Sequence, residues 1–143
     1  MNIHDVRALR AIRRRAADEA AQGVVQADAQ RADADHALAS FRTDMGDEAQ
    51  RAQGLLPTRT LAAWYRAAAK YLHELEACAV ERADEATAAR EALRSAALEA
   101  ERLDTVSEQL EAKRRLEMAR QVQSDMDELA LRRRSRRFQY REV

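Results

Sequence analysis

Residues 46–58, with the sequence GDEAQRAQGLLPT, decide the fold because they hold most of the residues that end helices. Gly46, Gly54 and Pro57 all lie in this stretch, and only one other glycine occurs in the chain. Gly54 suits the left-handed conformation that often follows a helix, and Thr58 is a candidate N-cap for a new helix. The stretch therefore predicts one helix before it and a second helix after it.

The composition on both sides of this stretch favours long helices over a globular core. Aromatic residues make up 4% of the 143 residues, and there is 1 proline. A compact core needs bulky side chains and turns, whereas Ala, Glu, Arg and Leu are strong helix formers. We expect an all-α fold in which two long helices form an antiparallel coiled-coil hairpin with an overhanging C-terminal helix.

We expect a single domain over residues 1–143. It contains a helix over about 3–53, a loop over about 54–58, a helix over about 58–134 and a basic tail over 132–143. Apolar residues recur in steps of three and four in both helices, as in a coiled coil. The positions expected between the helices are Val24, Ala27, Arg31, Ala34, Leu38, Phe41 and Met45, and then Leu61, Trp64, Ala68, Tyr71, Leu75, Cys78, Ala89, Ala92, Ala96, Leu103, Val106 and Leu110.

The short loop also predicts which residues lie opposite each other. A loop of about five residues between long helices gives an antiparallel pair. With the turn near residues 55 and 56, the basic residues near the N-terminus face acidic residues of the second helix. The pairs expected from this register are Arg7 with Asp104, Arg10 with Glu101 and Arg13 with Glu99.

The second helix is too long to be covered by the first, which ends opposite about residue 108. The remainder spans about 40 Å at about 1.5 Å per residue. A lone helix with an uncovered apolar side is marginal in water, so we expect a partner to cover it. The apolar residues of this overhang are Leu110, Leu116, Met118, Val122, Met126, Leu129 and Leu131.

The residues that carry catalysis or bind metals are not grouped in this sequence. His4, His36 and His73 are far apart, and Cys78 follows His73 by five residues, outside the spacing of two ligands on one helix face. Two helices also form no water-excluding pocket. We therefore expect no enzymatic activity, catalytic residue, cofactor, metal site or small-molecule substrate, and we expect the single cysteine, Cys78, to be a packing residue.

Charge and hydropathy limit the remaining classes of protein. The chain has 25 basic and 25 acidic residues, whereas nucleic-acid-binding domains are usually basic overall. No apolar run approaches the roughly 18 residues of a membrane helix, and the start, MNIHDVRALRAIRRR, has no apolar signal region. We expect a cytoplasmic protein that contacts a membrane only indirectly.

The start of the second helix, LAAWYRAAAKYLHELEACAVER over residues 61–82, is rich in aromatic residues. Trp64, Tyr65, Tyr71 and Leu72 fall on more than one helix face. Two interpretations stay open: Trp64 and Tyr71 pack between the helices near the loop, or the surplus apolar surface is a docking patch.

The chain resembles the FliJ/YscO family, whose members form the central stalk of type III secretion and flagellar export machines. The similarity lies in the glycine-containing loop, the aromatic-rich helix start ending in a Leu-Glu pair, and the segment ERLDTVSEQLEAKRRLEMARQVQSDMDELALRR. It covers most of the chain, although its motifs are diffuse. The resemblance implies a stalk on the cytoplasmic side of the inner membrane, peripherally associated with the secretion apparatus.

The resemblance also implies partners and contact residues. The C-terminal helix would enter the hexamer of the export ATPase, and another part would contact the cytoplasmic ring of the export gate and, in some members, secretion chaperones. Matching the Leu75-Glu76 pair places the gate contact on Tyr71, Leu75, Cys78 and Arg82, beside the patch of Trp64 and Tyr65. The ATPase contact would comprise Met118, Val122, Met126, Leu129, Arg132, Arg133, Arg134, Arg136 and Arg137.

Cys78 and Arg82 depart from the small and imidazole side chains that the family pattern implies there. A residue buried between the helices is also not available to a partner, so the family reading conflicts with the periodicity at Tyr71, Leu75 and Cys78. Two other functions stay open. The overhang of one copy could pair with that of another in a self-associating scaffold, or the arginines of the tail LALRRRSRRFQYREV could bind nucleic-acid phosphates.

Overall fold

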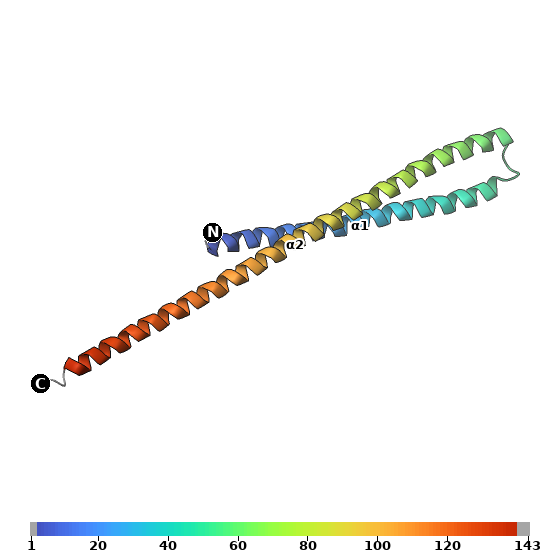
Figure 1. Ribbon diagram of the computed structural model, residues 1–143. Coiled ribbons are helices and arrows are strands. Elements are labelled where there is room, and N and C mark those ends of the chain that lie inside the picture. The colour runs from blue at the N-terminus through green and yellow to red at the C-terminus, as the bar shows by residue number, and fades with distance from the viewer. Residues whose placement is uncertain (1–2, 140–143) are drawn as a thin grey trace. The chain divides into compact units, whose positions relative to one another are not determined.

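The structure, a computed structural model, describes residues 3–139, and the side chains of residues 4–134. It is an all-α hairpin of two helices, α1 over Ile3–Ala52 and α2 over Thr58–Gln139 (Figure 1). The expected fold class is confirmed, and α1 ends one residue before its expected end.

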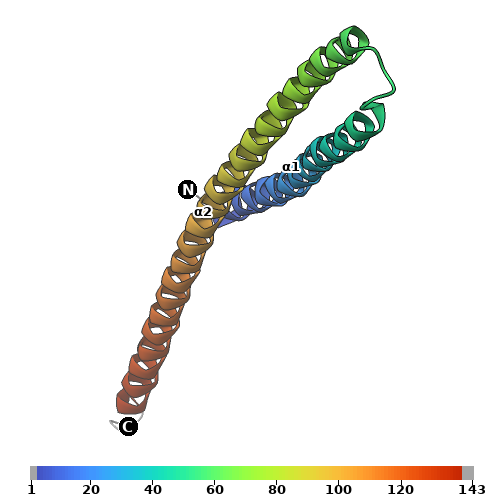
Figure 2. The same ribbon diagram turned by 90° about the vertical axis from the view of Figure 1, so that its right-hand side faces the viewer.

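The loop between the helices is built as its glycine and proline predict, with one correction. Gly54 has a φ of +82°, and the Leu55 amide donates to the Ala52 carbonyl at 3.1 Å across it. The Leu61 amide donates to the Pro57 carbonyl at 3.0 Å, so Pro57 accepts the first helical bond and takes the N-cap position. The prediction of Thr58 as N-cap is wrong by one residue, because Thr58 is already helical. Figure 2 shows the loop that joins the two helix ends.

Helix α2 continues to Gln139, beyond the end expected near residue 134. Arginine is a good helix former, and the basic stretch contains neither glycine nor proline to end the helix. The last part of the expected basic tail, residues 140–143, lies outside the described residues.

The chain divides into two compact units, of which the larger comprises residues 13–98. On α1, the expected inward positions Val24, Ala27, Arg31, Ala34, Leu38, Phe41 and Met45 are all partly buried. On α2, the residues spaced by seven from Leu61 are likewise partly or fully buried. They are Leu61, Ala68, Leu75, Arg82, Ala89 and Ala96 in this unit, and the same row continues at Leu103 and Leu110 in the other unit.

The second inward row of α2 differs from the expectation by one residue. Tyr71 is 49% exposed and Val106 is 36% exposed, and Ala92 is exposed as well. Trp64 and Cys78 are partly buried as expected, but a step of four residues follows Ala68, so the row shifts to Leu72. Because small side chains fill most of this second row, the helices can approach each other closely. The inward residues are Leu72, Ala79, Ala86, Leu93, Ala100 and Ser107.

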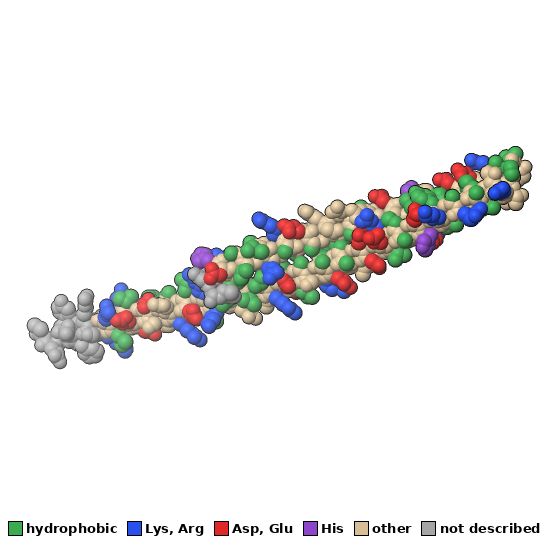
Figure 3. Space-filling view, turned by 90° about the horizontal axis from the view of Figure 1, so that it is seen from above, with side chains coloured by type: hydrophobic (Ala, Val, Ile, Leu, Met, Phe, Trp, Pro, Cys, Tyr) green, Lys and Arg blue, Asp and Glu red, His purple; other side chains and the backbone are tan. Residues whose placement is uncertain are grey.

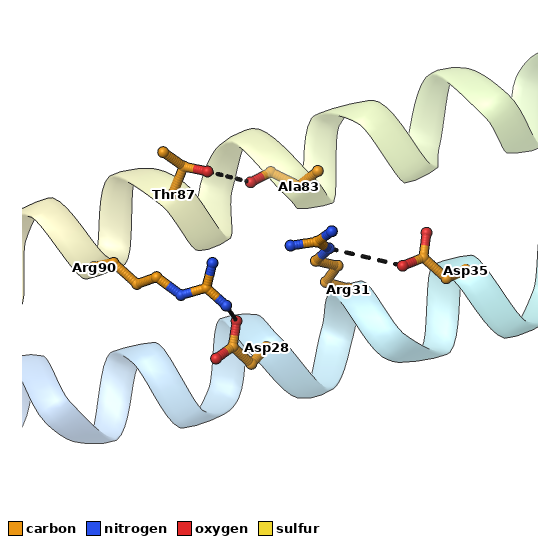
Figure 4. A network of polar contacts seen from close by, with 6 residues as sticks. All are labelled: Asp28, Arg31, Asp35, Ala83, Thr87 and Arg90. Atoms are coloured by element: carbon orange, nitrogen blue, oxygen red, sulfur yellow. Dashed lines mark hydrogen bonds and ion pairs between the residues drawn. The ribbon is translucent and has the colours of Figure 1, made fainter.

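Polar contacts between the helices accompany this packing in the larger unit. Arg90 Nη2 lies 2.6 Å from Asp28 Oδ1, and Arg42 Nη2 lies 2.7 Å from Glu76 Oε1. Arg31 extends into the space between the helices, where its Nε lies 3.7 Å from Asp35 Oδ2 (Figure 4). Exposed ion pairs contribute about 0–1 kcal/mol each, so they set the register more than the stability.

In the other unit, residues 3–12 of α1 pack against α2 from residue 99 onward. Val6 is fully buried, and Ala100 and Ser107 are buried on α2. Arg10 pairs with Asp104, and Arg7 Nη2 lies 3.1 Å from Glu111 Oε1. Acidic residues of α2 thus pair with these arginines as expected, but the expected partners, Glu101 for Arg10 and Asp104 for Arg7, are wrong.

Side-chain direction explains these displaced pairs. Helical side chains lean toward the N-terminus of their own helix. In an antiparallel pair, those of α1 lean away from the loop and those of α2 lean toward it. A side chain of α1 therefore meets a residue further along α2 than the one directly opposite. The shift is three residues for Arg10 and seven for Arg7.

Ser107 provides a test of the packing in this unit. Its side chain is 1% exposed, and its Oγ has no hydrogen-bond partner in the described part of the chain. A buried unsatisfied hydroxyl costs about 1–3 kcal/mol. We expect Ser107→Ala to raise the free energy of unfolding by about 1–2 kcal/mol, measured by urea denaturation followed by circular dichroism.

The matched control is Ser95→Ala, at an exposed position of the same helix. This variant reports helix propensity alone, about 0.5 kcal/mol. Equal gains from both substitutions would contradict the burial of Ser107 without a partner.

Candidate functional site

The part of α2 that follows the last ion pair with α1 is uncovered. Every residue from Ala112 to Arg134 is exposed, and we call residues 112–134 the free segment. Figure 3 shows hydrophobic side chains among basic and acidic ones along the part of α2 that leads to the C-terminus. The expected overhang is thus present in the structure.

Large apolar side chains of the free segment lie mainly on one face. At about 100° per residue, four of them fall within about 80° of the helix circumference, and Leu116 and Leu131 lie on the opposite side. The four are 54% to 62% exposed. This apolar face consists of Met118, Val122, Met126 and Leu129.

The spacing of the apolar face differs from that of the hairpin. The rows spaced by seven residues stop at Ser107 and Leu110, because Arg114 and Glu117 occupy the next positions. Ser107, Met118 and Leu129 are instead spaced by eleven residues. An eleven-residue spacing follows a nearly straight line along a helix, whereas a seven-residue spacing requires a left-handed supercoil. The free segment is therefore not patterned to continue the hairpin.

The basic end of the free segment is only lightly neutralised. Arg132 Nη2 lies 2.6 Å from Glu128 Oε1, whereas Arg133 and Arg134 are exposed and make no ion pair within the described residues. Arg136 and Arg137 lie in α2, but their side chains lie outside the described ones. A partner of the apolar face would therefore also meet positive charge next to it.

The aromatic residues at the start of α2 lie at the edge of the hairpin. Trp64 is partly buried, and its ring centroid lies 5.0 Å from that of Tyr65, with an angle of 72° between the planes. Tyr71 packs edge-on against Phe41 of α1 at 4.8 Å and 80°. Both tyrosines remain more than 40% exposed. Tyr71 thus packs against α1, and Trp64 is partly buried, as the first interpretation expects. The docking patch stays a prediction, with both tyrosines exposed.

The other residues of the expected gate contact are less accessible. Leu75 and Arg82 lie in the inward row, and Cys78 is partly buried. Arg82 donates to Gln30 Oε1 of α1 at 3.2 Å and to Glu85 Oε2 at 2.7 Å. The hydrogen bond to Glu85 and its negative charge raise the pKa of Arg82 further above its usual value. The residues carried over from the family pattern therefore do not form one exposed face.

A groove that the sequence reasoning missed lies between the helices near the loop. Its volume is about 300 Å³. Both walls use positions i, i+3, i+4 and i+7 of a helix, which is the spacing of one helix face. Such a set of four residues on each of two facing helices is a pattern in the sequence that would have predicted the groove. The lining residues are Phe41, Asp44, Met45 and Glu48 on α1, and Trp64, Ala67, Ala68 and Tyr71 on α2.

The remaining surface features are weaker candidates for a functional site. A hollow of about 600 Å³ lies beside His73, Val80 and Asp84, but its lining comes from α2 alone, so it has no opposite wall. Among residues 3–139, no group of three or more His, Cys, Asp or Glu is placed to hold a metal ion. Within the same residues, neither helix has a stretch long and apolar enough to cross a bilayer.

Comparison with known proteins gives no match: no protein family, curated protein or solved structure matches the chain. The free segment and the groove are therefore the two features on which a proposal about function rests. The first has an exposed apolar face, and the second combines aromatic and acidic walls.

The exposure of the free segment can be tested by charge substitution. Val122→Lys places a charge on an exposed helix face, so we expect the free energy of unfolding to change by less than about 0.5 kcal/mol. Leu93→Lys places the same charge in the inward row of α2, where we expect a loss of about 3 kcal/mol. Urea denaturation of both variants at several protein concentrations measures this difference. A comparable loss in Val122→Lys would show that the apolar face is already covered.

Proposed function

We propose that this chain is the stalk of a type III protein export apparatus, with the free segment inserted into the hexamer of the export ATPase. The observation that carries the proposal is the apolar face of Met118, Val122, Met126 and Leu129, which is exposed. It lies on the part of α2 beyond Glu111, which is about 40 Å long. The resemblance to the FliJ/YscO family supplies the identity of the partner.

The free segment has the chemistry that insertion into a ring requires. Burying a large apolar side chain contributes about 1.5–3 kcal/mol, and four such side chains offset part of the cost of association. Arg133 and Arg134 supply positive charge at the end that would enter the ring, with Arg132, Arg136 and Arg137 beside them. The acidic or polar groups of the ring would pair with these guanidinium groups.

The hairpin end of the molecule would contact the cytoplasmic ring of the export gate. Tyr65 and Tyr71 are the exposed residues of the aromatic patch, and they are the contacts we propose. Leu75, Cys78 and Arg82 would contribute only their exposed edges. Secretion chaperones are further partners of this surface, and the complex would lie on the cytoplasmic side of the inner membrane.

A self-associating scaffold is the second candidate, because the same apolar face would also suit a second copy of α2. The two candidates differ in the behaviour of the isolated protein. A stalk sediments as a monomer at all concentrations, whereas a scaffold forms dimers through its free segments. Sedimentation velocity over a range of concentrations distinguishes them.

The proposal predicts that the apolar face governs stimulation of the ATPase. We expect Met118→Glu combined with Val122→Glu to lower the affinity for the export ATPase at least tenfold, because two charges would be buried against the ring. The measurement is the concentration of this protein that gives half-maximal stimulation of ATP hydrolysis by the ATPase. The export ATPase from the same organism is the partner to use.

The matched control is Leu116→Glu combined with Leu131→Glu, which adds the same charge on the opposite side of the free segment. We expect a smaller effect from this pair. Unchanged stimulation by the Met118 and Val122 variant, with an intact hairpin by circular dichroism, would refute insertion through the apolar face.

A further inference from the structure

The groove near the loop combines an acidic wall with an aromatic wall. We propose that it binds the side chain of an arginine presented by a partner protein. This inference does not rest on insertion into the export ATPase, because the groove lies in the unit of residues 13–98 and shares no residue with the free segment. Tyr71 belongs both to the groove and to the proposed gate contact, but arginine binding is inferred from the groove alone.

The wall formed by α1 carries two carboxylates. Asp44 and Glu48 are separated by one helical turn, and both are exposed. Neither makes a hydrogen bond or an ion pair within the described residues. Like charges at this spacing repel each other, so a cation between them relieves an unfavourable interaction.

The arginines closest in sequence do not supply this cation. Arg42 Nη2 is held 2.7 Å from Glu76 Oε1 on α2. Arg51, three residues after Glu48, makes no ion pair within the part of the chain that the structure describes. On α2, Arg66 Nε donates to the carbonyl of Ala62. The negative charge of Asp44 and Glu48 is therefore available to an external group.

The wall formed by α2 offers aromatic rings and small side chains. Tyr71 is fixed by its edge-on contact with Phe41, and Trp64 lies on the same wall one helical turn from Ala67 and Ala68. Cations are attracted to the faces of aromatic rings, most strongly to tryptophan. The two alanines leave room for the methylene groups that precede a charged head.

Arginine fits this combination better than other cations do. Its planar guanidinium stacks on aromatic rings and donates hydrogen bonds to carboxylates in a fixed fork. A quaternary ammonium group also binds aromatic rings, but it has no N–H to donate to Asp44 and Glu48. The ammonium of lysine donates hydrogen bonds but has no plane to stack against Trp64.

Trp64 gives a direct readout, because it is the only tryptophan of the chain. The probe is N-acetyl-arginine amide, titrated into the full-length protein at constant ionic strength while Trp64 fluorescence is recorded. For a single side chain in an open groove we expect a saturable change with a Kd of about 1 mM. The citrulline analogue, which has the same shape without the charge, should give no saturable change.

Two double variants locate the binding. We expect Asp44→Asn combined with Glu48→Gln to weaken the binding of arginine amide about tenfold. Asp33→Asn combined with Asp47→Asn removes the same charge from exposed positions of α1 outside the groove, and it should leave the Kd unchanged. Circular dichroism verifies that all variants remain helical.

Three outcomes would overturn the inference. They are no saturable response to arginine amide, an equal response to citrulline amide or choline, and an equal loss of affinity in the two double variants. Each of these leaves the ATPase assay of the free segment unaffected, so failure of one proposal is distinguishable from failure of the other.

Discussion

The length of α1 relative to α2 is the constraint on which the rest of the structure depends. Helix α1 has 50 residues and α2 has 82, so α1 pairs with α2 only as far as Glu111. The sequence of α2 follows this limit, because its seven-residue rows of small and apolar side chains stop at Ser107 and Leu110. Beyond them the apolar residues follow another spacing and are exposed.

The hairpin itself is held by many small contributions. Alanine fills four of the six buried positions of the described residues, and each buried methyl contributes about 0.8 kcal/mol. Cross-helix pairs such as Arg90 with Asp28 fix which residues face each other. Near the loop, larger side chains replace alanine, and Phe41, Trp64 and Tyr71 hold the edge of the hairpin open as a groove. Packing and the candidate binding surface therefore come from the same residues.

The sequence predicts the fold through a few residues with a clear physical role. Gly54 and Pro57 locate the loop, and the positions expected in the row from Leu61 to Leu110 are all partly or fully buried. Arg82 also lies in this row, where the apolar spacing does not predict it. The second row is misplaced because apolar residues occur at both Tyr71 and Leu72, so hydrophobicity alone does not select the inward one. The exposure of the free segment follows from helix lengths. The groove does not follow from the helix lengths, because it depends on which faces of the two helices meet.

Hydrogen exchange of the full chain with and without the export ATPase tests most directly whether the free segment enters the ring, as we propose. We expect amides of residues 112–134 to exchange quickly in the isolated protein and to become protected when the ATPase is added. Residues 61–110, which already pack against α1, should change little. Protection confined to the hairpin, with the free segment unchanged, would contradict the account.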